Sequence, residues 1–108
     1  MRIKNKKTYY LKRKILIEDS EGGKYSSYSD EATEIKANIY PANGKLQAEI
    51  YGERLNYMLN MLYDGSEPLN EGDGICIYVS KDNNPDYKII SIKPYSHMMI
   101  ELEKIQWV

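Results

Sequence analysis

The side chains that most often perform catalysis or bind metals are scarce in this sequence. Cys76 and His97 are the only cysteine and the only histidine among 108 residues. A disulfide within the chain is therefore impossible, and a zinc site lacks its usual ligands. His97 follows Ser96, but no nucleophile elbow is present, so a Ser-His-acid triad is not indicated and His97 is interpreted as a structural or surface residue. We predict no catalytic residue, no metal site and no cofactor.

Two turn-like segments contain carboxylates that need an explanation. Asp82-Asn83-Asn84-Pro85-Asp86 clusters oxygen ligands, but it lacks the closing Glu of a calcium loop and is interpreted as a hairpin connection. Gly72-Asp73-Gly74 is not followed by the Gly-Lys-Ser/Thr of a phosphate loop. It is interpreted as the turn into a strand that begins at Ile75. Cys76, in that apolar strand, is expected to pack on one face of the sheet.

Charge is balanced overall but is unevenly distributed along the chain. Lys and Arg number 15, Asp and Glu 16, and this argues against a protein that works by general attraction to nucleic acid or membranes. Residues 2–17 nevertheless contain seven bases and no acid, and residues 18–36 contain six acids and two lysines. The two stretches could pair within one molecule or head-to-tail between copies. Lys12, Arg13 and Lys14 are therefore candidates for a subunit or DNA contact.

The sequence contains neither the pattern of a secretory signal nor that of a membrane-spanning helix. The basic residues 1–7 are not followed by an apolar signal core, and no apolar run approaches about 18 residues. We therefore expect no membrane span, and we expect the chain to stay where it is made.

Alternating apolar and polar residues predict strands over most of the chain. The predicted strands cover residues 8–18, 31–40, 75–80, 87–93 and 98–106. Residues 19–30 are interpreted as a loop or hairpin turn that is tightest at Gly22-Gly23, and residues 64–74, 81–86 and 95–97 as turns. In the first strand, Arg13 is the misfit on a face that is otherwise apolar (Tyr9, Leu11, Ile15, Ile17).

Residues 45–63 are ambiguous between a strand and a helix. Leu46, Ala48 and Ile50 alternate as in a strand, whereas Leu55, Leu59 and Leu62 have helical spacing. We favour a strand because the surrounding segments are sheet-like. The Leu- and Met-rich part, residues 55–63, also fits a helix laid on the barrel or an adaptable contact surface.

Together these patterns predict a mostly β fold. The expected architecture is a small antiparallel β-barrel of five to six strands with long loops and at most one short helix. Residues 1–7 are expected to be a flexible basic N-terminal arm, and residues 8–108 a single β-barrel domain. Because Tyr9 and Tyr10 lie on a basic strand, one alternative function is an OB-like barrel that binds single-stranded nucleic acid.

A series of short motifs resembles one known family. The run Ile35-Lys36-Ala37-Asn38-Ile39-Tyr40-Pro41-Ala42-Asn43-Gly44 is followed by Tyr51-Gly52-Glu53-Arg54-Leu55, by the Gly-Asp-Gly turn into strand 75–79, and by Pro85-Asp86-Tyr87-Lys88-Ile89-Ile90. A Tyr95-x-His97 turn and a final strand to Lys104 close the series. In order and spacing, residues 8–105 are similar to the head-closure (head-completion) and minor capsid proteins at the head-tail junction of siphophages and prophages.

The resemblance implies a structural protein and no enzyme. Such proteins have a small β-barrel core and assemble as a homo-oligomeric ring under the portal and its adaptor. The ring closes the DNA channel and offers a docking surface for the tail. Related proteins use a long central loop as a channel stopper, which here corresponds to about residues 41–56, with Asn43, Gly44, Tyr51 and Gly52 as the best-matched positions. The implied location is the virion, with the host cytoplasm before assembly.

Overall fold

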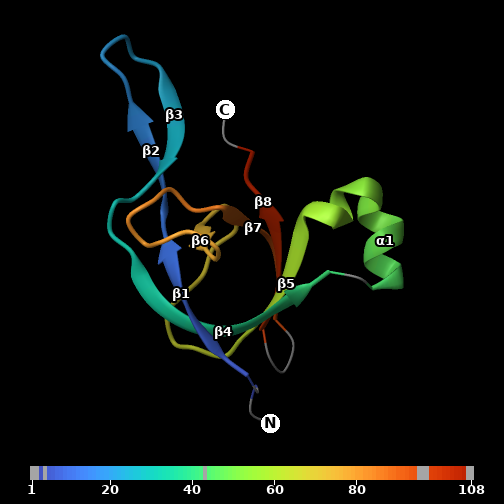
Figure 1. Cartoon of the computed structure of the whole chain (residues 1–108). Coiled ribbons are helices and arrows are strands. Elements are labelled where there is room, and N and C mark those ends of the chain that lie inside the picture. The colour runs from blue at the N-terminus through green and yellow to red at the C-terminus, as the bar shows by residue number, and fades with distance from the viewer. Residues whose placement is uncertain (1–2, 4, 43, 95–97, 107–108) are drawn as a thin grey trace.

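The structure is a computed structural model that describes residues 3, 5–42, 44–94 and 98–106 (Figure 1). The predicted turn at residues 95–97, with His97, and the predicted site residue Asn43 lie outside the described residues. The elements follow one another as β1 (Lys7–Lys12), β2 (Lys14–Glu18), β3 (Lys24–Tyr28), β4 (Thr33–Pro41), α1 (Lys45–Tyr51), the 3-10 helix η1 (Gly52–Tyr57), β5 (Met58–Tyr63), β6 (Gly74–Cys76), β7 (Tyr87–Pro94) and β8 (Met98–Lys104).

Six of the described strands close into an antiparallel barrel. The order around the barrel is β1-β4-β5-β8-β7-β6, and β6 pairs with β1 to complete the ring of hydrogen bonds. Closure leaves no free sheet edge in this part of the molecule. The prediction of a small antiparallel barrel with at most one short α-helix is confirmed.

The barrel interior is filled by alternate residues of its strands. Ile35 and Ala37 of β4 and Ile100 and Leu102 of β8 are almost completely buried, as the period of two requires. Leu59 lies opposite Leu102 in the register, which packs β5 and β8 side chains against each other inside the barrel.

The prediction of a single strand over residues 8–18 is wrong, because the segment is divided at Arg13 into two strands. Residues 7–12 form β1 of the barrel, whereas β2 leaves the barrel and pairs with β3 as a separate two-stranded sheet. We call β2, β3 and their turn (residues 14–28) the hairpin arm. Its turn is closed by Asp19, whose side chain accepts hydrogen bonds from the amides of Glu21 and Gly23. The hairpin turn was predicted, but the strand Lys24–Tyr28 was not.

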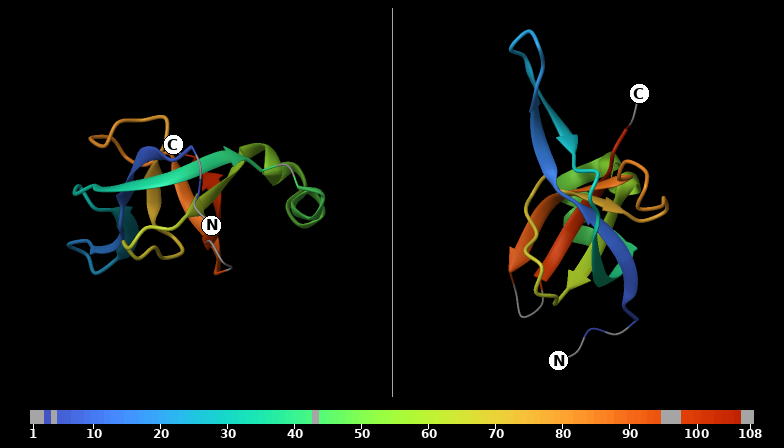
Figure 2. Two further views of the ribbon diagram at one scale, coloured as in Figure 1. Left: turned by 90° about the horizontal axis from the view of Figure 1, so that it is seen from below. Right: turned by 90° about the vertical axis from the view of Figure 1, so that its left-hand side faces the viewer.

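Residues 45–63 form a helix, a 3-10 helix and a strand in succession. The favoured prediction of a strand is wrong for residues 45–57, and it is correct for residues 58–63. Gly44 precedes α1, and Gly52 ends it. The φ of Gly52 is 58°, a backbone conformation that residues other than glycine rarely adopt. We call residues 44–57 the helical insertion. It extends from the barrel on the side away from the hairpin arm, as the left view of Figure 2 shows.

The predicted strand over residues 75–80 is shorter than expected. Only Gly74–Cys76 belongs to the sheet. The amides of Ile77 and Tyr78 donate instead to the carboxylate of Asp86, at 2.8 and 3.0 Å. Asp86 thus takes the donors that would have continued the strand, and it organises the hairpin connection predicted at residues 81–86.

Candidate functional site

The helical insertion is the first of two candidate contact elements. It joins the end of β4 to the start of β5, and its base is closed by a hydrogen bond from the amide of Ala42 to the carbonyl of Met58. Three of the four residues predicted for a channel loop are described here. Gly44 and Gly52 flank α1, and Tyr51 is its last residue.

The burial of α1 is the reverse of ordinary helix amphipathicity. Gln47 is the buried residue of α1, whereas Leu46 and Ile50 are 67% and 60% exposed. Leu46 and Ile50 are four residues apart and therefore lie on one face of the helix. The helix thus contacts the barrel through polar side chains and presents an apolar face outward.

A buried carboxylate receives the inward side of the helix. Glu101 of β8 is 0% exposed and lies opposite Asn60 of β5 on the outer surface of the barrel. The side-chain nitrogen of Gln47 donates to Asn60 at 2.7 Å and to Glu101 at 2.8 Å, and the Tyr51 hydroxyl donates to Glu101 at 3.0 Å. Lys93 Nζ lies 3.3 Å from the same carboxylate. We call these five residues the Glu101 cluster.

The Glu101 cluster favours the ionised carboxylate. Burial acts to raise the pKa of Glu101, but the hydrogen bonds from Gln47, Tyr51 and Lys93 and the Lys93 charge outweigh it, so the pKa lies below its ordinary value. Burial and the neighbouring carboxylate raise the pKa of the Tyr51 hydroxyl. The protonation states that hold α1 on the barrel are therefore those present at neutral pH.

The 3-10 helix is attached by a second, more exposed contact. Arg54 donates two hydrogen bonds to Glu103 of β8, at 2.8 and 3.1 Å, and its guanidinium lies 5.4 Å from the centre of the Tyr51 ring. These hydrogen bonds and the Arg54 charge lower the pKa of Glu103. Next to this pair is a depression of about 430 Å³, lined by Glu53, Arg54, Tyr57, Lys88, Glu103, Lys104 and Gln106.

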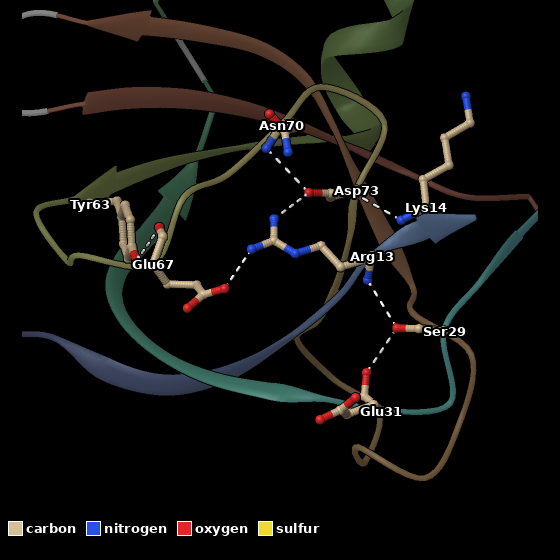
Figure 3. Close-up of polar contacts among 8 residues, drawn as sticks. All are labelled: Arg13, Lys14, Ser29, Glu31, Tyr63, Glu67, Asn70 and Asp73. Carbon is tan, nitrogen blue, oxygen red and sulfur yellow. Dashed lines mark hydrogen bonds and ion pairs between the residues drawn. The ribbon is translucent and has the colours of Figure 1, made fainter. Parts of the chain in front are cut away.

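The hairpin arm, the second candidate contact element, is anchored at Arg13. Figure 3 shows the Arg13 guanidinium between Asp73 and Glu67, with Nη1 2.9 Å from Asp73. Asp73 also accepts hydrogen bonds from the amides of Lys14, at 3.0 Å, and Asn70, at 3.2 Å. Asp73 is buried, so it ties the point where the chain leaves the barrel to the loop before β6. The misfit position of Arg13 in the alternating pattern is thus explained.

The three predicted contact residues on this segment have different environments. Lys12 is 5% exposed, and its Nζ donates to the carbonyl of Asn83 at 2.7 Å. Arg13 is paired with Asp73 and Glu67, whereas the side chain of Lys14 is exposed. Lys14 is the residue of the three that is placed to reach a neighbouring molecule.

The N-terminal segment and the Tyr-rich strand also have internal contacts. Ile3 is buried, and Lys6 Nζ lies 3.2 Å from Asp64. The ring of Tyr10 lies 5.7 Å from Lys81 Nζ, and Tyr9 packs against the core. Both Tyr residues named for the alternative nucleic-acid function are thus partly buried.

The remaining residues with reactive or metal-binding side chains form no further site among the described residues. Cys76 is buried, and burial raises the pKa of its thiol. Within the described part of the chain, His, Cys, Asp and Glu form no group that could hold a metal ion. Over the same residues, no helix has the length and apolar character needed to cross a membrane.

Sequence reasoning missed Gln47, Glu101, Glu67 and Asp73. Glu101 and Gln47 occupy positions that the alternating pattern assigns to an exposed face, and an exposed polar residue carries no signal of its own. Asp73 lies in a turn, where Asp is common for local reasons. The misfit of Arg13 was the one available signal, since a cation on an apolar face requires a buried anion nearby.

Comparisons with protein families, with curated proteins and with solved structures find no match to this chain.

Proposed function

We propose that this chain is a structural component of a phage or prophage head-tail connector. In this proposal it assembles as a ring under the portal and adaptor, closes the DNA channel and offers a docking surface for the tail. It acts without catalysing a reaction, in the virion, after synthesis in the host cytoplasm.

The observation that carries the proposal is the construction of the helical insertion. It occupies residues 44–57, which overlap all but the first three residues of the stretch, about residues 41–56, that the resemblance assigns to the channel loop. Its inward side is held by the Glu101 cluster, and its outward side displays Leu46 and Ile50. A segment that is firmly attached on one side and apolar on the other is suited to contact another molecule.

The remaining architecture supports the same role. A ring subunit needs a rigid body and at least two contact surfaces that point in different directions. The closed barrel supplies the rigid body, and the hairpin arm and the helical insertion extend from it on opposite sides (Figure 2). In this proposal packaged DNA lies near the insertion, and portal, adaptor and tail proteins are the partners.

Disruption of the gene in its phage or prophage tests this function. The expected result is tailless heads that have packaged DNA and lost it, with normal capsids and separate, normal tails. Complementation with the wild-type chain should restore tailed, DNA-filled particles. Tailed infectious particles in the absence of the gene would refute the proposal.

A variant that lacks the helical insertion tests the role of the insertion in this function. Residues 44–57 can be replaced by a short Gly-Ser turn, because the flanking Ala42 and Met58 are already hydrogen-bonded to each other. We expect this variant to fold but not to restore DNA-filled particles. A matched control is the substitution of the exposed Tyr78 by Ser, outside both the insertion and the hairpin arm, which should restore them.

A further inference from the structure

Exposed apolar side chains are concentrated on the two projections of the molecule. Eight large hydrophobic residues are exposed in the described part of the chain, and only Tyr78 and Met98 lie elsewhere. Three are on the hairpin arm and three on the helical insertion: Ile15, Leu16 and Tyr25, and Leu46, Ile50 and Tyr57. Ile15 and Tyr25 share one face of the arm, whereas Leu16 lies on its other face. An exposed apolar face on each projection suggests a contact in which each meets the other.

The hairpin arm has an apolar face without a cover in the described structure. In the register of the arm, Ile17 pairs with Tyr25 and Ile15 with Ser27, so Ile15, Ile17 and Tyr25 share one face. The strands β2 and β3 pair only with each other among the described residues. Packing of its apolar face stabilises a two-stranded sheet in water, so this face is suited to a partner.

The charges of the arm and of the insertion are complementary. The turn of the arm, residues 19–23, carries the carboxylates of Asp19 and Glu21 and no cation, and at its base Glu18 lies opposite Lys24 in the register. The depression beside η1 is lined by three cations, Arg54, Lys88 and Lys104, and by two carboxylates, Glu53 and Glu103. The exposed Tyr57 is part of the same lining. The acidic turn therefore fits a surface that is basic on balance and includes Tyr57 of the insertion.

We propose that the hairpin arm of one copy binds the helical insertion of a second copy, with Ile15 and Tyr25 against Leu46 and Ile50 and the acidic turn in the depression beside Tyr57. This contact is heterologous, because the two surfaces are different and lie on opposite sides of the barrel (Figure 2). Repetition of such a contact produces a ring when the rotation closes. The inference rests on the proposed function, since it supplies the subunit contact of the connector ring.

Cysteine cross-linking tests which surfaces meet. In a Cys76→Ser background, a Tyr25→Cys chain is mixed with an Ile50→Cys chain under oxidising conditions, at about 1 mM protein to capture weak association. We expect a disulfide-linked pair of one chain of each kind. The control mixes Tyr25→Cys with Tyr78→Cys, which is exposed and lies outside both surfaces. A yield no higher than this control would overturn the proposal, and so would linkage mainly between two Tyr25→Cys chains.

Mixing of charge variants tests the polarity of the contact. Ile15→Glu/Tyr25→Glu removes the arm surface, and Leu46→Glu/Ile50→Glu removes the insertion surface. The substituted residues are exposed, so both variants should retain the wild-type circular dichroism spectrum. In sedimentation experiments each variant alone should associate at least tenfold more weakly than the wild type. An equimolar mixture should regain association only as far as a 1:1 pair, because one intact contact remains.

The outcomes separate this contact from the proposed function. Variants that associate like the wild type would overturn the contact, even if gene disruption produces tailless heads. Association that depends on both surfaces would support the contact, even if particles assemble normally without the gene. A protein that stays monomeric at about 1 mM and gives no cross-link above the control contradicts the contact.

Discussion

Glu101→Ala should release α1 from the barrel at a large cost in stability. The substitution removes the acceptor of hydrogen bonds from Gln47 and Tyr51 and the partner of Lys93, and it leaves the inward side of α1 without its anion. Loss of one member of a buried charged network costs roughly 3–5 kcal/mol. Because Lys93 is partly exposed and can be solvated, we expect about 3 kcal/mol in the free energy of unfolding.

This loss is large on the scale of a domain of this size. A chain of 108 residues is stable by about 5–15 kcal/mol, so the variant should fold with a thermal midpoint lowered by about 15 °C. The free energy of unfolding is measured by urea denaturation with circular dichroism. The matched control is Glu103→Ala, two residues further along β8, whose partner Arg54 is exposed. It should cost less than about 1 kcal/mol.

Hydrogen exchange distinguishes release of α1 from general weakening. The amide of Ala48 donates to the carbonyl of Gly44 at 2.9 Å, and the amide of Gly52 donates to the carbonyl of Ala48. In Glu101→Ala both amides should lose nearly all of their protection, whereas a barrel amide such as that of Met61 should lose only as much as the decrease in global stability requires. Equal costs for Glu101→Ala and Glu103→Ala, or unchanged protection at Ala48, would refute the role assigned to the Glu101 cluster.

Further predictions concern the hairpin anchor, pH, the thiol and nucleic acid. Asp73→Asn replaces an acceptor that Arg13 and two amides share, so it should cost about 2 kcal/mol in unfolding free energy and increase exchange at the Lys14 amide. The lowered pKa values of Glu101 and Glu103 contribute stability above the ordinary carboxyl pKa of about 4.3, and this contribution is lost as pH falls below it. The buried Cys76 thiol, with its raised pKa, should react with a disulfide reagent at neutral pH only as fast as the protein opens. Oligonucleotide titrations in low salt should show weak binding, in accord with the net charge of -1.

Each of these predictions has a control and a contrary result. Asp82→Asn, at an exposed position, should leave stability unchanged, and an equal loss for both variants would contradict the anchor role of Asp73. Glu101→Gln should flatten the acid limb of the stability profile, and an unchanged limb would contradict the assignment to Glu101. Rapid labelling of Cys76 in the native protein would contradict its burial. Tight, salt-sensitive oligonucleotide binding would favour the single-stranded nucleic-acid function over the connector.

The strands that could be predicted are those whose two faces differ in polarity. In β4 and β8, the inward Ile35, Ala37, Ile100 and Leu102 alternate with polar residues, so the period of two identifies both strands. Closure of the barrel was also expected from several short strands joined by turns. The order of the strands around it depends on pairings between distant segments, such as β1 with β6, which no local pattern contains.

Two structural errors arose where a polar side chain competes with the sheet. The strand after Ile75 ends early because the Asp86 carboxylate binds the next two amides. The strand through residues 8–18 breaks because Arg13 has carboxylate partners in the loop before β6. In both cases the partner is distant in the sequence or lies beyond a turn, so a pattern confined to one segment cannot include it.

The error at α1 has a different origin, and it bears on the function that we propose. The alternation of Leu46, Ala48 and Ile50 favours a strand over a helix, but the segment is a helix in which Leu46 and Ile50 lie outside and Gln47 lies inside. Hydrophobic patterning identifies the buried side of an element only when the isolated chain covers all of its apolar surface. In α1 the barrel is contacted by polar groups and the apolar side is left uncovered, which is the arrangement that the proposed contact with a second copy requires. The apolar pattern of residues 46–50 therefore fails to predict the fold of the single chain, and it is consistent with the proposed contact.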